Sequence, residues 1–157
     1  MTSFSEKIKS FLLRLFSLNS PTFSQIVLSS GTAENIMEFA NKNYPKEFVS
    51  LLRGEIKDGK LIIDGLYYLP FQSSKKAAFI TYNIPTMNDL VGSVHSHPSR
   101  KSGPSETDLR FFNKRGAVHM IISYPYEKED IACYGLYGDE LEFSIMDVEF
   151  RDDKDRE

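Results

Sequence analysis

The sequence predicts an α+β fold in which helices flank one mixed central β-sheet. Segments with strand composition outnumber segments with helical periodicity, and most of them follow one another directly along the chain, as is typical of this class. The chain has 157 residues, a length that fits one domain. Hydrophobic residues make up 41% and charged residues 26% of the chain. Because these values are ordinary for a globular protein, disordered and fibrous proteins are excluded.

The first helix is expected at residues 32–43, after a short strand at residues 23–28. Apolar residues recur in the helical segment at the spacing of one helix face. They are Ala33, Ile36, Met37 and Ala40. Pro45 follows and closes the helix, because a proline disfavours helical backbone in the residue before it.

The middle of the chain is expected to consist mainly of strands. Gly54 is expected to end a buried strand at residues 47–52, and a hairpin turn at residues 57–59 leads into the next strand. The other predicted strands cover residues 61–69, 77–82, 90–96 and 118–123. These runs are rich in the aliphatic and aromatic residues that favour extended backbone.

The second helix is expected at residues 105–115, with Gly116 as its C-terminal stop. Strands at residues 131–137 and 140–145 should then form a final hairpin that turns at residues 138–139. In the predicted arrangement the strands form one mixed sheet and the helices flank it.

The two ends of the chain differ from its body, so we divide it into segments 1–20, 21–146 and 147–157. Apolar residues in the first segment recur at helical spacing and predict an amphipathic helix. They are Phe4, Ile8, Phe11, Leu12, Leu15 and Phe16. We expect this stripe to pack on the protein body or on another copy, with weak membrane-surface or partner docking as the alternative. The last segment is rich in acidic residues and is predicted to be a solvated tail.

Charge and cysteine content exclude several classes of protein. The formal net charge is −3, which argues against a nucleic-acid binder because such proteins need a clustered cationic surface. The single cysteine, Cys133, excludes an internal disulfide framework and a zinc ribbon. The sequence contains no apolar run of about 20 residues that could form a transmembrane segment. A cytoplasmic location is therefore expected.

The segment from His95 to Asp108 carries the most specific chemistry. Alternate residues of a strand share one face, so His95 and His97 should point the same way and Ser96 the opposite way. Two such imidazoles can converge on one metal ion. Asp108 lies in the first turn of the second predicted helix and could supply a third ligand. Two histidines and one carboxylate leave a fourth tetrahedral position for water, which is typical of catalytic zinc.

Plainer interpretations exist for each part of this cluster. Ser105 and Asp108 have the spacing of a capping box with a short acid, although capping and metal binding are compatible. A pair of histidines two residues apart is more often structural than metal-binding when it stands alone. The combination of His, His, Ser and Asp at set spacings is far more specific than either part.

These residues resemble the JAMM motif of the MPN-domain metalloproteases. The motif is His-x-His-Pro, ten intervening residues and an Asp, with a Ser three before that Asp. The family also has an upstream glutamate in a Pro-x-Glu pattern followed by apolar residues and a Gly, which residues 45–54 match with Glu47. The resemblance spans residues 24–145 and is strongest to the stand-alone prokaryotic members. It implies a single MPN domain with a cytidine-deaminase-like sheet. The short interval at residues 83–89 departs from the eukaryotic deubiquitinating relatives, so their ubiquitin contacts do not transfer.

The resemblance implies amide hydrolysis at one zinc ion with a bound catalytic water. His95, His97 and Asp108 would bind the metal, Glu47 would act as general base and then acid, and Ser105 would stabilise the oxyanion. The implied substrate is the peptide or isopeptide bond after the C-terminal glycine of a ubiquitin-like modifier or a sulfur-carrier protein. Two alternatives are a non-catalytic MPN scaffold and a binding module for ubiquitin-like proteins in which the zinc is structural.

The remaining reactive side chains receive plainer interpretations. His119 lies in an apolar run and is expected to be a satisfied strand histidine, with support of the metal ligands as the alternative. Cys133 is expected to be a small core residue rather than a nucleophile. Arg100 and Lys101 are expected to be solvated charges, with contact to an acidic modifier as the alternative.

Overall fold

The computed structural model describes residues 22–67, 88–100, 103–112 and 116–148. Three sequence predictions lie outside the described residues: the helix at residues 1–20, the strand at residues 77–82, and the acidic tail from residue 149 onward. The division of the chain into three segments therefore stays a prediction.

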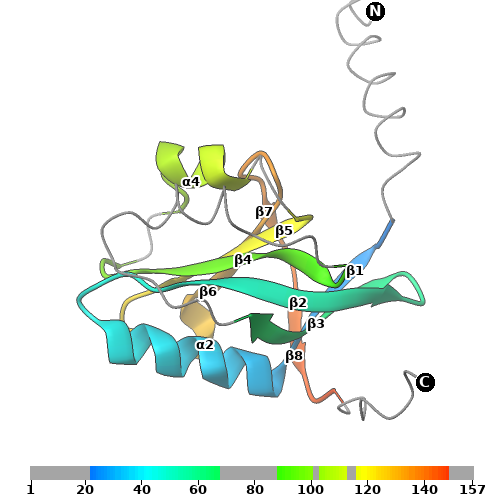
Figure 1. Ribbon diagram of the computed structural model, residues 1–157, viewed down its shortest axis with the longest axis horizontal. Helices are drawn as coiled ribbons and strands as arrows, with labels where there is room; N and C mark the ends of the chain where they lie inside the picture. Colours follow the sequence, from blue (N-terminus) through cyan, green and yellow to red (C-terminus); the bar gives the residue numbers. More distant parts are fainter. Residues whose placement is uncertain (1–21, 68–87, 101–102, 113–115, 149–157) are drawn as a thin grey trace, which may run out of the picture.

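Within the described residues, eight strands form one mixed sheet with the order β7-β6-β5-β4-β2-β3-β1-β8 (Figure 1). The pair β4–β5 and the pairs that β1 makes with β3 and β8 are parallel, and the other pairs are antiparallel. The strands are β1 (Gln25–Ser29), β2 (Val49–Lys57), β3 (Lys60–Tyr67), β4 (Leu90–His97), β5 (Val118–Ser123), β6 (Ile131–Tyr134), β7 (Glu140–Leu141) and β8 (Ser144–Met146). The predicted α+β class with a mixed central sheet is confirmed.

The described part of the chain places α2 (Ser30–Asn43) and α4 (Glu106–Phe112) on opposite sides of the sheet, and a short 3-10 turn (Lys128–Asp130) precedes β6 (Figure 1). Ser29 caps α2 by accepting a hydrogen bond from the backbone N–H of Thr32. The apolar face of α2 is buried, as its periodicity predicts. Its buried residues are Thr32, Ala33, Ile36 and Ala40.

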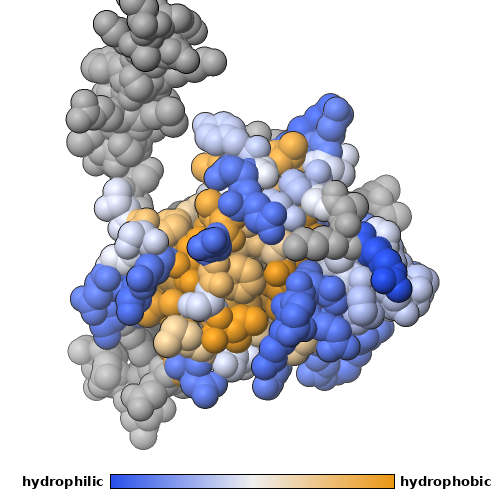
Figure 2. All heavy atoms as spheres, turned by 180° about the vertical axis from the view of Figure 1, so that it is seen from behind, coloured by the Kyte–Doolittle hydropathy of each residue, from blue (hydrophilic) through white to orange (hydrophobic). Residues whose placement is uncertain are grey.

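The main hydrophobic core lies between α2 and the sheet, and a smaller cluster lies beneath α4. The smaller cluster consists of Phe112, Ile121, Ala132 and Tyr134, with Leu109 packed against it. Apolar side chains also gather in the middle of the face seen from behind, where hydrophilic side chains frame them (Figure 2). The two helices thus cover two separate packing layers on one sheet.

The structure corrects the predicted end of the second strand. The strand β2 begins at Val49 rather than at residue 47 and continues through Gly54 to Lys57. The β2–β3 pairing shifts register between Arg53 and Gly54. A Cβ atom at Gly54 would lie only 2.3 Å from the backbone oxygen of Ile62. Gly54 therefore allows a close approach of two strands at an irregularity, which is a common role of glycine inside a strand.

The predicted last hairpin is correct for its first part only. β6 and β7 pair antiparallel, and the turn is closed by a hydrogen bond of 2.8 Å from the N–H of Gly135 to the carbonyl of Asp139. The segment at residues 140–145 does not form one strand, however. β7 pairs with β6 at one edge of the sheet, whereas β8 pairs with β1 at the other edge.

Candidate metal centre

The two histidines of β4 point to the same face of the sheet, on the side covered by α4. The distance between His95 Nε2 and His97 Nε2 is 3.0 Å. His95 is only 5% exposed. The side chain between them, Ser96, points to the opposite face and is fully buried. The alternation predicted from the sequence is therefore present.

Asp108 approaches both imidazoles from α4. Its Oδ1 lies 3.0 Å from His95 Nε2, and its Oδ2 lies 3.3 Å from His97 Nε2. The structure thus brings together three of the five sequence-predicted site residues from two elements that are separated by a loop. Among the described residues, these three form a group of side chains that could hold a metal ion.

The spacing of the three donors fits a tetrahedral zinc ion. Bonds of about 2.0–2.1 Å at tetrahedral angles place neighbouring ligand atoms roughly 3.3 Å apart. The two imidazole Nε2 atoms lie 3.0 Å apart, and Asp108 presents Oδ1 to His95 at 3.0 Å and Oδ2 to His97 at 3.3 Å. One donor atom from each of the three residues lies within 4.8 Å of the other two, a spacing that one ion can bridge. Imidazole and carboxylate groups are also common zinc ligands. Both the geometry and the chemistry of the site therefore fit the metal that the sequence motif implies.

Mutual hydrogen bonds and charges shift the pKa values of these groups. Burial raises the pKa of Asp108, but hydrogen bonds from His95 and His97 outweigh this effect and hold it well below its usual range. A hydrogen bond to Asp108 raises the pKa of His97; burial opposes the increase, and the carboxylates of Asp108 and Glu47 add to it. The site therefore favours an ionised carboxylate and attracts positive charge.

Ser105 caps α4 at its N-terminus. The Ser105 backbone N–H and hydroxyl each donate to Asp108 Oδ2 at 2.7 Å, and the Asp108 N–H donates to Ser105 Oγ at 3.2 Å. This is the reciprocal capping predicted from the Ser-x-x-Asp spacing. The cap fixes the side chain of Asp108 in the first turn, and Ser105 itself stays exposed.

Glu47 lies in the segment just before β2, at the same end of the sheet. Val49 pairs with His95 in the antiparallel β2–β4 ladder, and the Ser96 N–H donates to the Phe48 carbonyl at 3.0 Å. Continuing this register places Glu47 opposite His97, and the Glu47 carboxylate contributes to the raised pKa of His97. Glu47 is exposed. The fourth sequence-predicted site residue therefore lies at the same end of the sheet as the candidate metal ligands.

Three tyrosines flank the segment that carries Glu47. The Tyr44 ring lies 5.2 Å from Tyr124 and 6.2 Å from Tyr126, measured between centroids. The Tyr124 N–H donates to the carbonyl of His97 at 3.1 Å. Burial raises the pKa of Tyr126, and the charges on Tyr44 and Glu47 add to this effect. This aromatic group connects the loop before β2 with the loop after β5.

The positions of the remaining reactive residues agree with a buried strand histidine, a core cysteine and an exposed arginine. His119 is a buried strand histidine, and its Nδ1 lies 2.7 Å from Ser93 Oγ. Cys133 is buried, and burial raises the pKa of its thiol to about 12, so it stays protonated at neutral pH. Arg100 is exposed, and Lys101 lies outside the described residues.

Sequence reasoning missed two residues that support the site. Ser96 accepts a hydrogen bond of 2.8 Å from the backbone N–H of Phe48 and so attaches the Glu47 segment to β4. Phe112 stacks on His119 beneath α4, with centroids 4.3 Å apart. A local signal existed for Phe112, because it follows Asp108 by four residues and must share its helix face. Ser96 offered no comparable signal, since its partner is 48 positions away.

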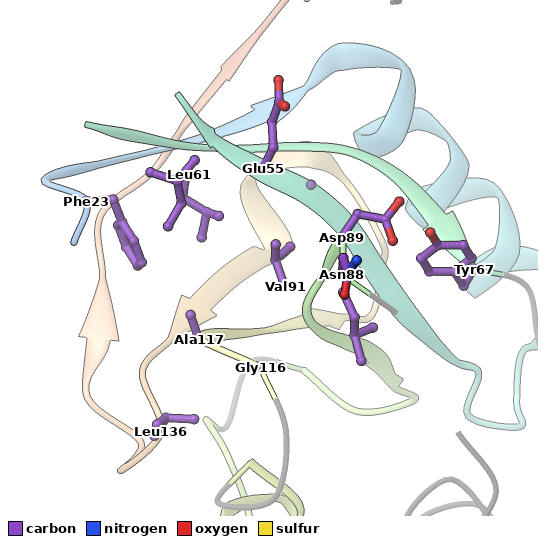
Figure 3. Close-up of a pocket in the computed structure, with 13 residues that line it drawn as sticks. Phe23, Glu55, Leu61, Tyr67, Asn88, Asp89, Val91, Gly116, Ala117 and Leu136 are labelled. Carbon is purple, nitrogen blue, oxygen red and sulfur yellow. The ribbon is translucent and has the colours of Figure 1, made fainter. Parts of the chain in front are cut away.

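A separate cavity of about 1050 Å³ lies near the start of β4 (Figure 3). Apolar side chains form much of its wall, among them Phe23, Ile56, Leu61, Val91 and Leu136. Val91 precedes His95 by four residues on the same strand, which corresponds to roughly 13 Å at the rise of extended backbone. None of the lining residues belongs to the candidate metal site.

Comparisons with known proteins agree with the geometry. Residues 29–135 match the family of prokaryotic homologues of the JAB domain. A probable metalloprotease of Haloferax volcanii is 31% identical over 134 residues, which cover 78% of this chain and 83% of that protein. No helix in the described part of the chain is long and apolar enough to cross a membrane.

Two solved structures are similar in both fold and sequence. A JAB1/MPN domain protein from Archaeoglobus fulgidus is 35% identical with a TM-score of 0.62, covering 79% of this chain and all of that one. The second structure is described as JAMM, a metalloprotease-like zinc site in the proteasome and signalosome. It is 34% identical with a TM-score of 0.61, and the match covers 80% of this chain and all of that one.

Proposed function

Because this chain belongs to the prokaryotic JAB family of JAMM-type metalloproteases, we propose that it is a zinc-dependent peptidase or isopeptidase. The proposed substrate is the bond after the C-terminal glycine of a ubiquitin-like modifier or a sulfur-carrier protein. The observation that carries the proposal is the convergence of His95, His97 and Asp108, each of which offers one donor atom within 4.8 Å of the other two.

His95, His97 and Asp108 would hold the metal. A bound zinc ion supplies Lewis acidity and lowers the pKa of a coordinated water to about 7. The capping contacts of Ser105 keep Asp108 oriented toward the two imidazoles. Because the pKa of Asp108 is held well below its usual range, its carboxylate is charged at every physiological pH.

Glu47 is the proposed general base. Its carboxylate is exposed at the same end of the sheet as His97, so water and substrate can reach it. Glu47 would accept a proton from the attacking water and pass it to the leaving amine, a role that typically accelerates a reaction by about 10²–10⁴-fold. The Ser105 hydroxyl would turn from Asp108 Oδ2 to donate to the oxygen of the scissile carbonyl as negative charge develops there, while the Ser105 backbone N–H would keep its hydrogen bond to Asp108.

Two alternatives from other classes are less well supported. A non-catalytic scaffold has no physical need for three converging donors next to an accessible carboxylate. A structural zinc site normally has four protein ligands, whereas the donor group found among the described residues has three members.

Cleavage of defined fusions separates these functions. The substrates would be a linear and a lysine-linked fusion of a ubiquitin-like protein that ends in Gly-Gly. We expect cleavage after the last glycine, loss of cleavage with a chelator, and recovery when zinc is added back. The same test is made with fusions of a sulfur-carrier protein. A protein that retains zinc but cleaves none of these fusions would contradict the proposed function.

A further inference from the structure

The last turn of α4 is anchored to the sheet by a pair of stacked rings. The rings of Phe112 and His119 lie 4.3 Å apart with an angle of 4° between their planes. Phe112 is fully buried and His119 is 1% exposed. This contact joins the helix that carries Asp108 to β5, which contributes no metal ligand.

The imidazole of His119 is fixed from the side of the sheet as well. Ser93 and His119 are register partners in the parallel β4–β5 pair, and Ser93 Oγ lies 2.7 Å from His119 Nδ1. Burial lowers the pKa of His119 to about 4, and a hydrogen bond with the backbone of Phe112 opposes this shift only in part. At neutral pH the ring is therefore uncharged and its plane is set by the hydroxyl of Ser93.

The spacing of α4 matches the spacing of the strands beneath it. Asp108 and Phe112 are four residues apart on one helix face, a rise of about 6.0 Å. Ser93 and His95 are two residues apart on one strand face, a rise of about 6.6 Å. Asp108 consequently meets His95 while Phe112 meets His119, so the helix is held at two points that lie one turn apart.

We propose that His119 is a positioning residue for the metal centre, because it fixes α4 along the sheet so that the carboxylate of Asp108 reaches His95 and His97. This inference rests on metal binding at the proposed site and does not depend on which bond is cleaved.

The helix needs such an anchor. The described part of α4 has seven residues, and helices of fewer than about 12 residues are marginal without tertiary contacts. The helix also packs on the apolar cluster around Ile121 and Ala132, and the Phe112 ring lies 6.3 Å from the ring of His95. Packing contacts of this kind do not specify direction, whereas the hydrogen bond between Ser93 and His119 fixes the ring on which Phe112 stacks. A slip of one turn would move Asp108 by about 5.4 Å, whereas a metal ligand must be placed within about 0.2 Å.

The test compares zinc affinity and cobalt spectra in two variants of the full chain. His119→Ala removes the ring under Phe112. Met120→Ala is the matched control, because Met120 is the next residue on β5, is fully buried, and belongs to the core on the other side of the sheet. Affinity is measured by competition with a chromophoric chelator. The visible absorption of the cobalt-loaded protein reports the ligand geometry.

We expect His119→Ala to weaken zinc binding about tenfold, as is usual for residues that orient metal ligands, and to change the cobalt spectrum. Met120→Ala should lose stability but keep the affinity and the spectrum of the natural protein. The proposal would be overturned if His119→Ala kept the zinc affinity and cobalt spectrum of the natural protein. It would also be overturned if Met120→Ala lost as much zinc affinity as His119→Ala. If the natural chain itself binds no zinc, the proposed function fails at its first step.

His119→Phe keeps the proposal testable if His119→Ala does not fold. This variant retains a flat ring for Phe112 and loses the hydrogen bond to Ser93. We expect a zinc affinity between those of the natural chain and a tenfold-weakened site, together with a changed cobalt spectrum. An unchanged spectrum and affinity would overturn the role of His119.

Discussion

The backbone N–H of Phe48 donates a hydrogen bond of 2.8 Å to the side chain of Ser96, which lies between the two candidate metal ligands on β4. The Ser96 N–H in turn donates to the Phe48 carbonyl at 3.0 Å. These two bonds attach the residue after Glu47 to the strand of the histidines. The candidate general base and the candidate metal site therefore share one rigid connection.

Replacing Ser96 with Ala is expected to lower turnover without lowering zinc affinity. The variant leaves the buried N–H of Phe48 without its partner, which costs about 1–3 kcal/mol of stability and loosens the segment that carries Glu47. We expect the turnover number to fall about tenfold, because misplacement by about 1 Å is costly in catalysis.

Ser50→Ala provides the matched control for that experiment. Ser50 is also a buried serine, and its hydroxyl donates to the carbonyl of Tyr67 on β3 at 2.7 Å rather than bonding to β4. It should lose similar stability and keep its turnover number. Equal losses of turnover in both variants would show that Ser96 acts only through global stability.

Glu47→Gln is expected to bind zinc normally and to lose about 10²–10⁴-fold in turnover, since the amide cannot accept a proton from water. Zinc content and fusion cleavage are measured on the same preparation. Glu34→Gln changes an exposed acid on α2 and should leave both quantities unchanged. Full turnover in Glu47→Gln would remove Glu47 from the mechanism.

Zinc binding is expected to weaken as the pH falls. A proton and the metal compete for the imidazole of His97, and its raised pKa makes the proton a stronger competitor than at an isolated histidine. Below that pKa the zinc affinity should drop up to about tenfold per pH unit for each proton displaced. Competition titrations at pH 8, 7 and 6 measure this slope. An affinity that is constant across this range would contradict ligation by His97.

The chain is also expected to lose stability between pH 6.5 and pH 4 because His119 is buried and uncharged. The pKa of His119 is lowered to about 4 in the folded protein, so in this window only the unfolded chain takes up the proton, and unfolding becomes easier as the pH falls. The full loss is about 3 kcal/mol. Denaturant unfolding of metal-free protein at pH 7 and pH 4.5 should show a shallower pH dependence in His119→Phe. Identical slopes would contradict a neutral buried imidazole.

The parts of the fold and site that the sequence predicted well depend on local spacing. His95 and His97 share a face of the sheet because strand residues alternate. Ser105 and Asp108 exchange capping hydrogen bonds at the start of α4 because both lie in its first turn. Neither relationship requires knowledge of distant contacts, so both could be read directly from residue spacing.

The parts that the sequence did not predict depend on pairing between distant segments. The segment at residues 140–145 forms two strands instead of one because β8 pairs with β1, which lies near the other end of the chain. The place of Glu47 follows from the β2–β4 register, which only the family resemblance anticipated. The stack of Phe112 on His119 likewise requires the crossing of α4 over β5.

X-ray absorption of the zinc-loaded protein tests the central claim most directly. The account predicts one zinc ion per chain, with two imidazole nitrogens and a carboxylate oxygen at about 2.0–2.2 Å, and loss of the metal in both His95→Ala and Asp108→Ala. Failure of the natural chain to retain zinc, or an unchanged zinc signal in those two variants, would contradict it.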